Sequence, residues 1–285
     1  MPELPEVETI AKRLAQVVVG QRISNITVLR EKSFQGTPSS LFGATITAIT
    51  RRSKILQFHF DQDNALLVHL KMTGQLIYVD DQRRVGGGHP TADWVSELPS
   101  KHTRVIFDLQ DTHNNKSSLF FNDMRVFGWL KVLDAAGVTA EFAGLGPDIT
   151  DSAATLAYFA KKIADKNTPI KQVIMDNSVV AGVGNIYAND ALNLARINPF
   201  RPANSLDNMQ VEQLYHALQT VIHSGIALGG ATMENFRHID GFSGDYQKQV
   251  LTYGREGEPC KNCAGIIIRK KQAGRSTFYC PNCQK

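Results

Sequence analysis

The first residues of the chain could supply a nucleophile that needs neither a metal nor a cofactor. Removal of the initiator Met would leave Pro2 with a free secondary amine. An α-amine titrates at about pH 8, so an appreciable neutral fraction exists at pH 7. Such an amine can attack a sugar C1′ and form an iminium. Proline and the neighbouring Glu3 are also favoured in the first turn of any helix, which is the alternative explanation of the same residues.

The four cysteines of the chain have the spacing of a zinc site. All of them lie within residues 260–285, and they are Cys260, Cys263, Cys280 and Cys283. Zinc takes four thiolates in a tetrahedron, and each Cys-x2-Cys turn can offer two of them. One bound zinc would stabilise a segment of about 40 residues, which cannot bury enough apolar surface alone. Two redox-active dithiols or a set of disulfides are the alternatives for this spacing.

Three short segments could bind phosphate groups. They are the basic run 51–54, which ends in Lys54, the glycine-punctuated turn 179–185, which ends in Asn185 as a helix cap, and the expected hairpin turn at Arg275. Cations and free backbone N–H groups at turns are suited to anions. Each segment also has an ordinary structural explanation: a solvated strand edge, a tight turn or an exposed arginine.

Three further residues could form a wedge in a nucleic acid duplex. They follow apolar runs, and they are Met72, Arg125 and Phe127. Apolar side chains inserted between bases unstack a duplex, and an arginine can fill the vacated pairing position. Taken one at a time, a methionine or phenylalanine at such a position is ordinarily a packing residue.

The charge of the chain is concentrated near its end. The net charge is +4 over 285 residues, yet residues 252–285 carry +5, which leaves −1 for the rest. Such an asymmetry favours a polyanionic partner. The sequence has no apolar run of the ~18 residues that a membrane span needs, and its acidic start is unlike a signal peptide. We therefore expect a cytoplasmic, nucleoid-associated protein that does not enter a membrane.

The hydrophobic periodicity predicts one helix, then strands, then several helices. A helix is expected over 3–19, ending at Gly20, and β-rich runs follow to about residue 133. Residues 80–102 have no period and are expected to form an exposed loop. Beyond a linker rich in Ala and Gly, helices are expected at 152–166, from 168–169, at 186–194 and at 205–228. Residues 266–268 and 276–279 flank a turn and predict a β-hairpin.

Five motifs, in order along nearly the whole chain, resemble the formamidopyrimidine-DNA glycosylase branch of the Fpg/Nei family. They are PELPEVET (2–9), HLKMTG (69–74), RVFG (125–128), MDN through GVGNIY (175–187) and RSTFYCPNC (275–283). The resemblance implies an α+β multidomain fold: an N-terminal helix plus β-sandwich, a helical helix–two-turn–helix domain and a C-terminal zinc-finger β-hairpin. The expected domains are 1–134, 152–243 and 244–285, with a linker at 135–151.

Carried over by motif, the resemblance implies a role for each site residue. Pro2 would attack C1′ of a flipped damaged nucleotide and form a Schiff base. Glu3 would protonate the opening deoxyribose, and Glu6 would position the N-terminus. Lys54 would act as acid or base during elimination and contact phosphate. Arg275 would bind the phosphate beside the lesion and assist the second elimination as a further catalytic residue. The DNA-backbone contacts would be His69, His102, Lys166 and Asn185, and the gap left by the flipped base would be filled by Met72, Arg125 and Phe127.

The implied function is that of a bifunctional base excision repair enzyme, a DNA glycosylase and AP lyase. It would act as a monomer on double-stranded DNA with abasic sites or oxidised purines, and β,δ-elimination would leave a one-nucleotide gap. The four cysteines would hold one structural Zn²⁺, and no organic cofactor is expected. An endonuclease VIII-like enzyme for oxidised pyrimidines and a non-catalytic zinc-finger lesion-binding protein are the alternatives.

The chain departs from the family pattern at several positions. Lys71 replaces a usual Gly, Val126 stands where a second Arg is frequent, and Asn189 and Asp190 replace Ser/Asp-Glu. The 80–102 segment is longer than the family pattern leads us to expect, and the sequence assigns it no role.

Overall fold

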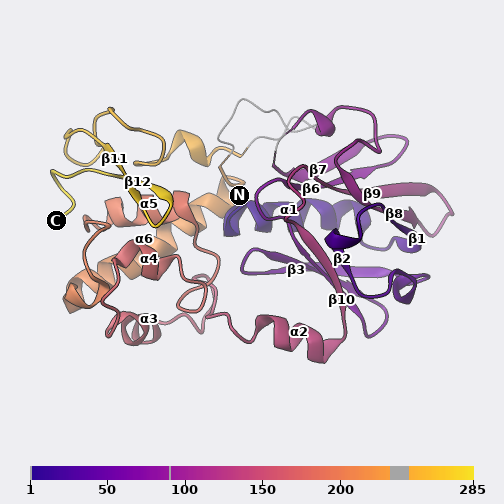
Figure 1. Ribbon diagram of the computed structural model, residues 1–285, viewed down its shortest axis with the longest axis horizontal. Coiled ribbons are helices and arrows are strands. Elements are labelled where there is room, and N and C mark those ends of the chain that lie inside the picture. Colours follow the sequence, from indigo (N-terminus) through magenta and orange to yellow (C-terminus); the bar gives the residue numbers. More distant parts are fainter. Residues whose placement is uncertain (1, 90, 232–243) are drawn as a thin grey trace. The chain divides into compact units, whose positions relative to one another are not determined.

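A computed structural model describes residues 2–89, 91–231 and 244–285. The described residues form two compact units (Figure 1), one of residues 2–143 with Gly244 and the other of residues 144–231 and 245–285. The change from one unit to the next falls inside the expected linker 135–151, whose first half is helix α2 (Ala135–Phe142). The expected boundary between residues 243 and 244 adjoins 232–243, which lie outside the described residues.

Two five-stranded sheets form the first unit and confirm the predicted β-sandwich. One sheet has the strand order β1-β8-β9-β6-β7, and the other has the order β2-β10-β5-β4-β3. All neighbours are antiparallel except the pair β2 and β10. The strands are β1 (Arg22–Val28), β2 (Phe34–Gln35), β3 (Ile46–Arg52), β4 (Ile55–Phe60), β5 (Ala65–His69), β6 (Gly74–Val79), β7 (Arg84–Gly88), β8 (Thr103–Gln110), β9 (Lys116–Asp123) and β10 (Trp129–Leu133).

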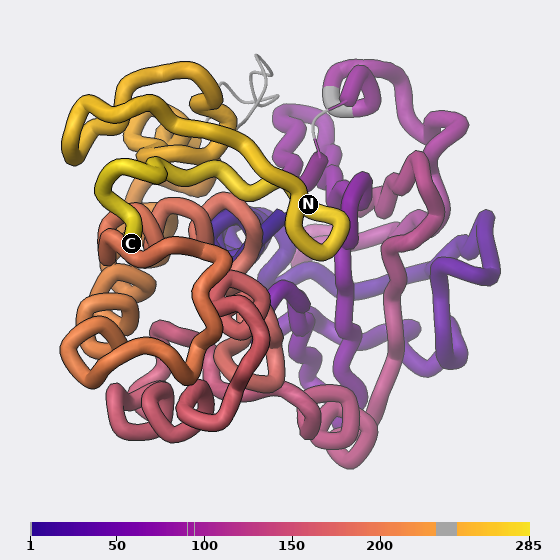
Figure 2. The backbone as a smooth tube through the Cα atoms, turned by 60° about the vertical axis from the view of Figure 1, so that its left-hand side comes forward, coloured from indigo at the N-terminus to yellow at the C-terminus, as the bar shows by residue number. Residues whose placement is uncertain are grey.

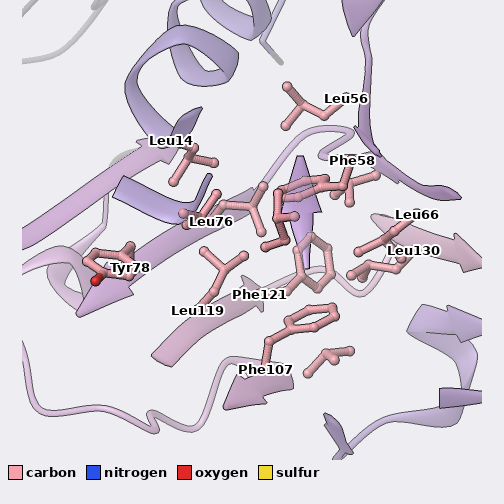
Figure 3. Packing of buried hydrophobic residues seen from close by; sticks show 14 of the residues in the cluster. Leu14, Leu56, Phe58, Leu66, Leu76, Tyr78, Phe107, Leu119, Phe121 and Leu130 are labelled. Atoms are coloured by element: carbon pink, nitrogen blue, oxygen red, sulfur yellow. The ribbon is translucent and has the colours of Figure 1, made fainter. Parts of the chain in front are cut away.

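The core of this unit is built from the facing sides of the two sheets and one helix. Figure 3 shows Phe58 and Leu66 of one sheet with Phe107 and Phe121 of the other, and Leu14 above them. Strand β8 alternates buried and half-buried residues along its whole length, as expected for a strand with one face in a core. Burying each such side chain stabilises the fold by about 1.5–3 kcal/mol.

Helix α1 (Leu4–Val18) confirms the predicted N-terminal helix. A proline stands in its first turn, and Gly20, with a φ of +87°, follows its end. The apolar side of α1 packs against β3 and β7, which are the edge strands of the two sheets. The helix therefore covers two strand edges that would otherwise be open to pairing with another chain.

The prediction of an exposed loop over residues 80–102 is wrong for residues 84–88. Residues 84–88 form strand β7, which pairs with β6, and a 3-10 turn η3 (Ala92–Trp94) follows. The three glycines at 86–88 have no side chains, so they gave no hydrophobic pattern. A Cβ on Gly87 would collide with the side chain of Ile10. Helix α1 can lie against β7 only because Gly87 lacks a side chain.

The second unit contains four α-helices among its described residues, and the β-hairpin. The helices are α3 (Leu156–Ile163), α4 (Ile170–Ile174), α5 (Asn185–Leu194) and α6 (Asn208–Ala227). Pro169 precedes α4 as its N-cap, and Gly229 and Gly230, both with positive φ, follow α6. The hairpin, yellow in Figure 2, consists of β11 (Ile268–Gln272) and β12 (Arg275–Tyr279). Ala273 and Gly274 both have positive φ, which is the geometry of a type I′ hairpin turn.

In the part of the chain that the structure describes, no helix is both long and apolar enough to cross a membrane.

Candidate active site and zinc centre

The predicted nucleophile and acid lie at the start of α1. Pro2 is buried, and Glu3 is only 4% exposed. Glu6 Oε2 accepts a hydrogen bond from the Glu3 backbone N–H at 2.8 Å, which closes the first turn of the helix. Because this bond fixes the peptide that joins Pro2 to Glu3, Glu6 sets the direction in which Pro2 leaves the helix. The geometry thus gives the positioning role expected of Glu6 a physical basis.

Lys54 lies in the turn between β3 and β4, and its residue is only 6% exposed. Arg51 holds this turn: its Nε donates to Glu8 Oε2 at 2.9 Å and its Nη1 donates to Ser53 O at 3.0 Å. Burial alone would raise the pKa of Glu8, but the contacts with Arg51 and Lys12 outweigh burial and lower it. Arg51 therefore ties the turn that carries Lys54 to helix α1, so the basic run is not merely a solvated strand edge.

His69 is held as a neutral hydrogen-bond donor. Its Nδ1 accepts the backbone N–H of Lys71 at 3.0 Å, so in the neutral ring the proton is on Nε2. Burial, together with the charges of Lys71 and Lys54, lowers the pKa of His69 to about 3. The structure thus brings His69 within electrostatic reach of Lys54, and His69 carries no charge at neutral pH.

We predict that His69→Asn makes the protein less sensitive to acid. The pKa of His69 is lowered on folding, so the unfolded chain takes up this proton first, and stability is lost as pH falls from about 6.5 towards 3. Between pH 7 and pH 4 this loss should be about 3 kcal/mol in the free energy of unfolding and absent from His69→Asn. The Asn oxygen can still accept the Lys71 N–H. Urea unfolding at several pH values measures the difference.

His113→Asn is the matched control, because His113 is exposed in the turn between β8 and β9. It should keep the acid sensitivity of the original chain. Identical pH dependence of the unfolding free energy in the original chain and in His69→Asn would contradict the assignment.

One buried carboxylate shapes both loops that carry the predicted wedge. Asp123 is fully buried and accepts the backbone N–H groups of Arg125, Phe127 and Gly128 at 3.1, 2.8 and 2.6 Å. It also accepts the hydroxyl of Thr73, whose own oxygen accepts the Arg125 N–H at 3.1 Å. Sequence analysis gave Asp123 no role, although an acid at the end of an apolar strand was a usable signal.

These contacts place the three predicted wedge residues on two adjoining loops. Met72 is 42% and Phe127 is 51% exposed, and the Arg125 guanidinium lies 4.8 Å from the centre of the Phe127 ring. Apolar side chains that remain exposed on a rigid loop are typical of a binding surface.

Both departures from the family pattern near these loops stand at left-handed backbone positions. Lys71 has a φ of +50° and Val126 a φ of +56°. Only glycine adopts such angles without strain, which explains why the usual family residue at the first position is Gly. For a β-branched residue such as Val126, the position is a genuine outlier.

We predict that Val126→Gly stabilises the protein. Relief of strain should raise the free energy of unfolding by about 1–2 kcal/mol. The greater conformational freedom of glycine in the unfolded chain should lower it by up to about 1 kcal/mol. Thermal unfolding should therefore show a net gain of about 1 kcal/mol. Val95→Gly is the control, since Val95 is exposed with a φ of −120° and should gain nothing. Equal changes in the two variants would contradict the strain at Val126.

Asn185 does not cap helix α5, as the sequence led us to expect. The N-cap is Gly184, and Asn185 is the first helical residue. Its amide Nδ2 donates to Ser276 O at 3.0 Å, which lies directly after Arg275. The correction follows from tertiary structure: the side chain finds a better partner in the hairpin than in its own helix.

A buried lysine that sequence analysis missed holds the same strand. Lys171 is 2% exposed, and its Nζ donates to Ser276 O at 3.0 Å and to Thr277 Oγ1 at 2.7 Å. Asn189 Oδ1 accepts the Phe278 N–H at 2.9 Å. Strand β12 is thereby anchored to α4 and α5, while Arg275 itself is exposed beside the turn.

The segment before the hairpin is anchored by Asp190, one of the departures from the family pattern. Asp190 is fully buried and accepts the backbone N–H groups of Leu251 and Thr252 at 3.0 and 2.9 Å and the hydroxyl of Tyr246 at 3.1 Å. Burial raises the pKa of Asp190 above its usual value. Asp190, although its side chain is shorter than that of the usual Glu, therefore links α5 to residues 246–252, which precede the hairpin.

The four cysteines fit a tetrahedral zinc ion. Their Sγ atoms all lie within 4.8 Å of one another, with Cys260 and Cys283 at 3.8 Å and Cys263 and Cys280 at 3.5 Å. A tetrahedron with Zn–S bonds of about 2.3 Å has sulfur atoms about 3.8 Å apart. All four are free cysteines, so the disulfide alternative does not describe this arrangement. Four protein ligands would leave no open position for a catalytic water, which makes the zinc structural.

The predicted site residues are divided between the two units. The first unit carries Pro2, Glu3, Glu6, Lys54, His69, Met72, His102, Arg125 and Phe127, and the second carries Lys166, Asn185, Arg275 and the four cysteines. His102 precedes β8 and is half-buried, with its ring bonded to Asp93. Lys166 is exposed after α3.

Three family models together cover most of the chain. They are the formamidopyrimidine-DNA glycosylase N-terminal domain at residues 1–130, the formamidopyrimidine-DNA glycosylase H2TH domain at 145–237, and the zinc finger found in FPG and IleRS at 257–285. The chain belongs to the formamidopyrimidine-DNA glycosylase family. This confirms the resemblance drawn from the five motifs.

Two curated relatives align with this chain over all or nearly all of their own length. Formamidopyrimidine-DNA glycosylase of Heliobacterium modesticaldum is 36% identical over 100% of both chains. That of Rickettsia conorii is 37% identical, over 100% of this chain and 99% of its own. The family assignment and the zinc finger model confirm the expected DNA glycosylase class and one structural zinc.

Solved structures of the family confirm the fold. MutM (FPG) of Thermus thermophilus has a TM-score of 0.85 at 33% identity, over 99% of this chain and 98% of that one. A Lactococcus lactis FPG mutant in complex with DNA containing Fapy-dG has a TM-score of 0.87 at 29% identity, over 100% of both chains. The Lactococcus enzyme has also been solved with DNA containing an abasic site.

Proposed function

We propose that this chain excises oxidised purines, such as 8-oxoguanine and formamidopyrimidines, from duplex DNA and then cleaves the strand by β,δ-elimination. Its membership of the formamidopyrimidine-DNA glycosylase family supports this proposal. The observation that carries it is the start of α1, where Pro2 and Glu3 are buried and Glu6 closes the turn behind them. A protein that only binds lesions needs neither residue.

In the proposed reaction, the neutral amine of Pro2 attacks C1′ of the flipped nucleotide. The bond from C1′ to the damaged base breaks, and the base leaves with a proton. Glu3 protonates the ring oxygen as the deoxyribose opens, which yields an iminium between Pro2 and C1′. Loss of a proton from C2′, with Lys54 as acid or base, then expels the 3′ phosphate. Loss of a proton from C4′, assisted by Arg275, expels the 5′ phosphate in a second elimination.

The remaining site residues bind and open the duplex in this proposal. Met72, Arg125 and Phe127 fill the gap left by the flipped base, which offsets part of the few kcal/mol that unstacking costs. The phosphate contacts are assigned to His69, His102, Lys166, Asn185 and Arg275. Such contacts are independent of sequence and should make binding steeply dependent on salt. We place this activity in the bacterial cytoplasm, at the nucleoid.

The test compares excision of 8-oxoguanine opposite cytosine with excision of thymine glycol opposite adenine, in otherwise identical duplexes. The proposal expects a preference for 8-oxoguanine of at least about 10-fold in kcat/KM, equivalent to about 1.4 kcal/mol of transition-state discrimination. A preference for thymine glycol would assign the chain to the endonuclease VIII-like class. Tight binding of both duplexes without strand cleavage would support lesion binding alone.

A further inference from the structure

The segment between β7 and β8 is built to hold one carboxylate. Gln75 Nε2 donates to Thr91 Oγ1 at 2.9 Å, and Thr91 Oγ1 accepts the Asp93 backbone N–H at 3.2 Å. Arg84 Nη2 donates to Asp93 O at 2.9 Å. The Asp93 residue is 7% exposed. Two strands of the sheet thus fix the backbone of Asp93 from both sides.

The carboxylate of Asp93 binds the ring of His102. Asp93 Oδ2 lies 2.8 Å from His102 Nδ1. A carboxylate only accepts, so Nδ1 must carry a proton. The backbone of His102 is fixed as well, because its N–H donates to Ser100 Oγ at 3.0 Å and its carbonyl accepts the Asp123 N–H at 2.9 Å.

Nδ1 donates a hydrogen bond in His102, whereas Nδ1 accepts one in His69. The neutral ring of His69 has its proton on Nε2, whereas the neutral ring of His102 has its proton on Nδ1. His102 Nε2 can therefore donate to a phosphate only when the ring is an imidazolium. At 2.8 Å from Nδ1, the carboxylate of Asp93 forms an ion pair with that charged ring.

We propose that Asp93 is a positioning residue that presents His102 to a DNA phosphate as an imidazolium. The inference rests on the phosphate contact that the proposed function assigns to His102. It also gives the longer segment at 80–102 a role, because that segment supplies Asp93. Other charged groups around the pair are Arg84 on β7, bonded to Asp93 O, and Arg104 on β8, which donates to Lys101 O and Asp123 O.

The consequence is that DNA binding takes up a proton at His102. Affinity should fall as pH rises, by up to about 10-fold per pH unit over the range in which the complex holds this proton and the free protein does not. A purely structural carboxylate would support the loop equally at every pH and would show no such slope.

The test is a double-mutant cycle on affinity for a duplex with a tetrahydrofuran abasic analogue, which is not cleaved. The chains are the original, Asp93→Asn, His102→Gln and the double variant, at pH 6, 7 and 8 and constant salt. Asp93→Asn keeps the shape of Asp93 without its charge. We expect it to weaken binding about 10-fold at pH 6 and to flatten the pH dependence. In the His102→Gln background, the same change should have less than a twofold effect.

Asp80→Asn is the matched control, since Asp80 lies in the turn before β7 and bonds Arg83. It removes the same charge without touching His102, so binding should change less than twofold and keep its pH slope. Equal losses from Asp93→Asn in both backgrounds, or an unchanged slope in His102→Gln, would overturn the proposal. So would an original chain that does not bind this duplex.

The outcomes separate this inference from the proposed function. If the original chain cleaves no 8-oxoguanine DNA but shows the coupling, the proposed reaction fails and the role of Asp93 stands. If it cleaves 8-oxoguanine DNA without the coupling, only the role of Asp93 fails.

Discussion

A chain that keeps any residue in front of Pro2 will form no covalent adduct with DNA. In such a chain the Pro2 nitrogen is part of an amide, and its lone pair is delocalised into the carbonyl. Excision and strand cleavage should both fall by at least about 10³-fold, the scale of loss when a nucleophile is removed. DNA affinity should change only a few-fold, because the proposed phosphate contacts do not involve Pro2. Borohydride trapping on an 8-oxoguanine:cytosine duplex, with peptide mapping by mass spectrometry, measures this.

The control is the same blocked protein after a protease has removed the extension and left Pro2 first. Intact mass establishes the state of the N-terminus in each sample. After the protease treatment, borohydride should again trap a covalent adduct with DNA, and the adduct should lie on Pro2 alone. An adduct on a lysine of the blocked chain, above all on Lys54, would show that the nucleophile is not Pro2. No adduct from zinc-loaded protein that begins at Pro2 would move the function to another lesion or to binding alone.

Loss of the zinc should remove DNA binding while the first unit stays folded. The buried core of the zinc-finger segment, residues 257–285, consists of Cys260, Ile267, Phe278 and Cys280, and two of these four are cysteines of the zinc site. A structural zinc contributes about 10–16 kcal/mol to such a segment, far more than two apolar side chains can replace. Without zinc, Arg275 and the other cations of residues 252–285 have no fixed position. We therefore expect affinity for lesion DNA to fall at least about 100-fold.

Cys280→Ser and chelation test this prediction in the full chain. Metal analysis should find one zinc per chain before treatment. Adding zinc back should restore affinity to the chelated protein and not to Cys280→Ser. Circular dichroism should keep the β signal of the first unit in both. Cys280→Ser protein that binds lesion DNA with the original affinity would contradict the structural role.

Features determined by neighbouring residues could be predicted from the sequence alone. Helix α1 and strand β4 follow from apolar spacing, and the zinc ligands follow from two Cys-x2-Cys turns. The family followed from motifs, which are themselves short local patterns. Strand β7 was missed because its glycines contribute no side chains to a pattern, and its place depends on Ile10 of a distant helix.

Only the tertiary structure decided which partner each buried polar group has. Lys171 bonds Thr277, 106 residues away, and Asp123 bonds Thr73, 50 residues away. A sequence gives the donors and acceptors but not their pairing, because the pairing depends on which strands and helices pack together. The two histidines show the consequence most directly. His69 and His102 are chemically identical in the sequence, and their protons are placed on opposite ring nitrogens by Lys71 and Asp93.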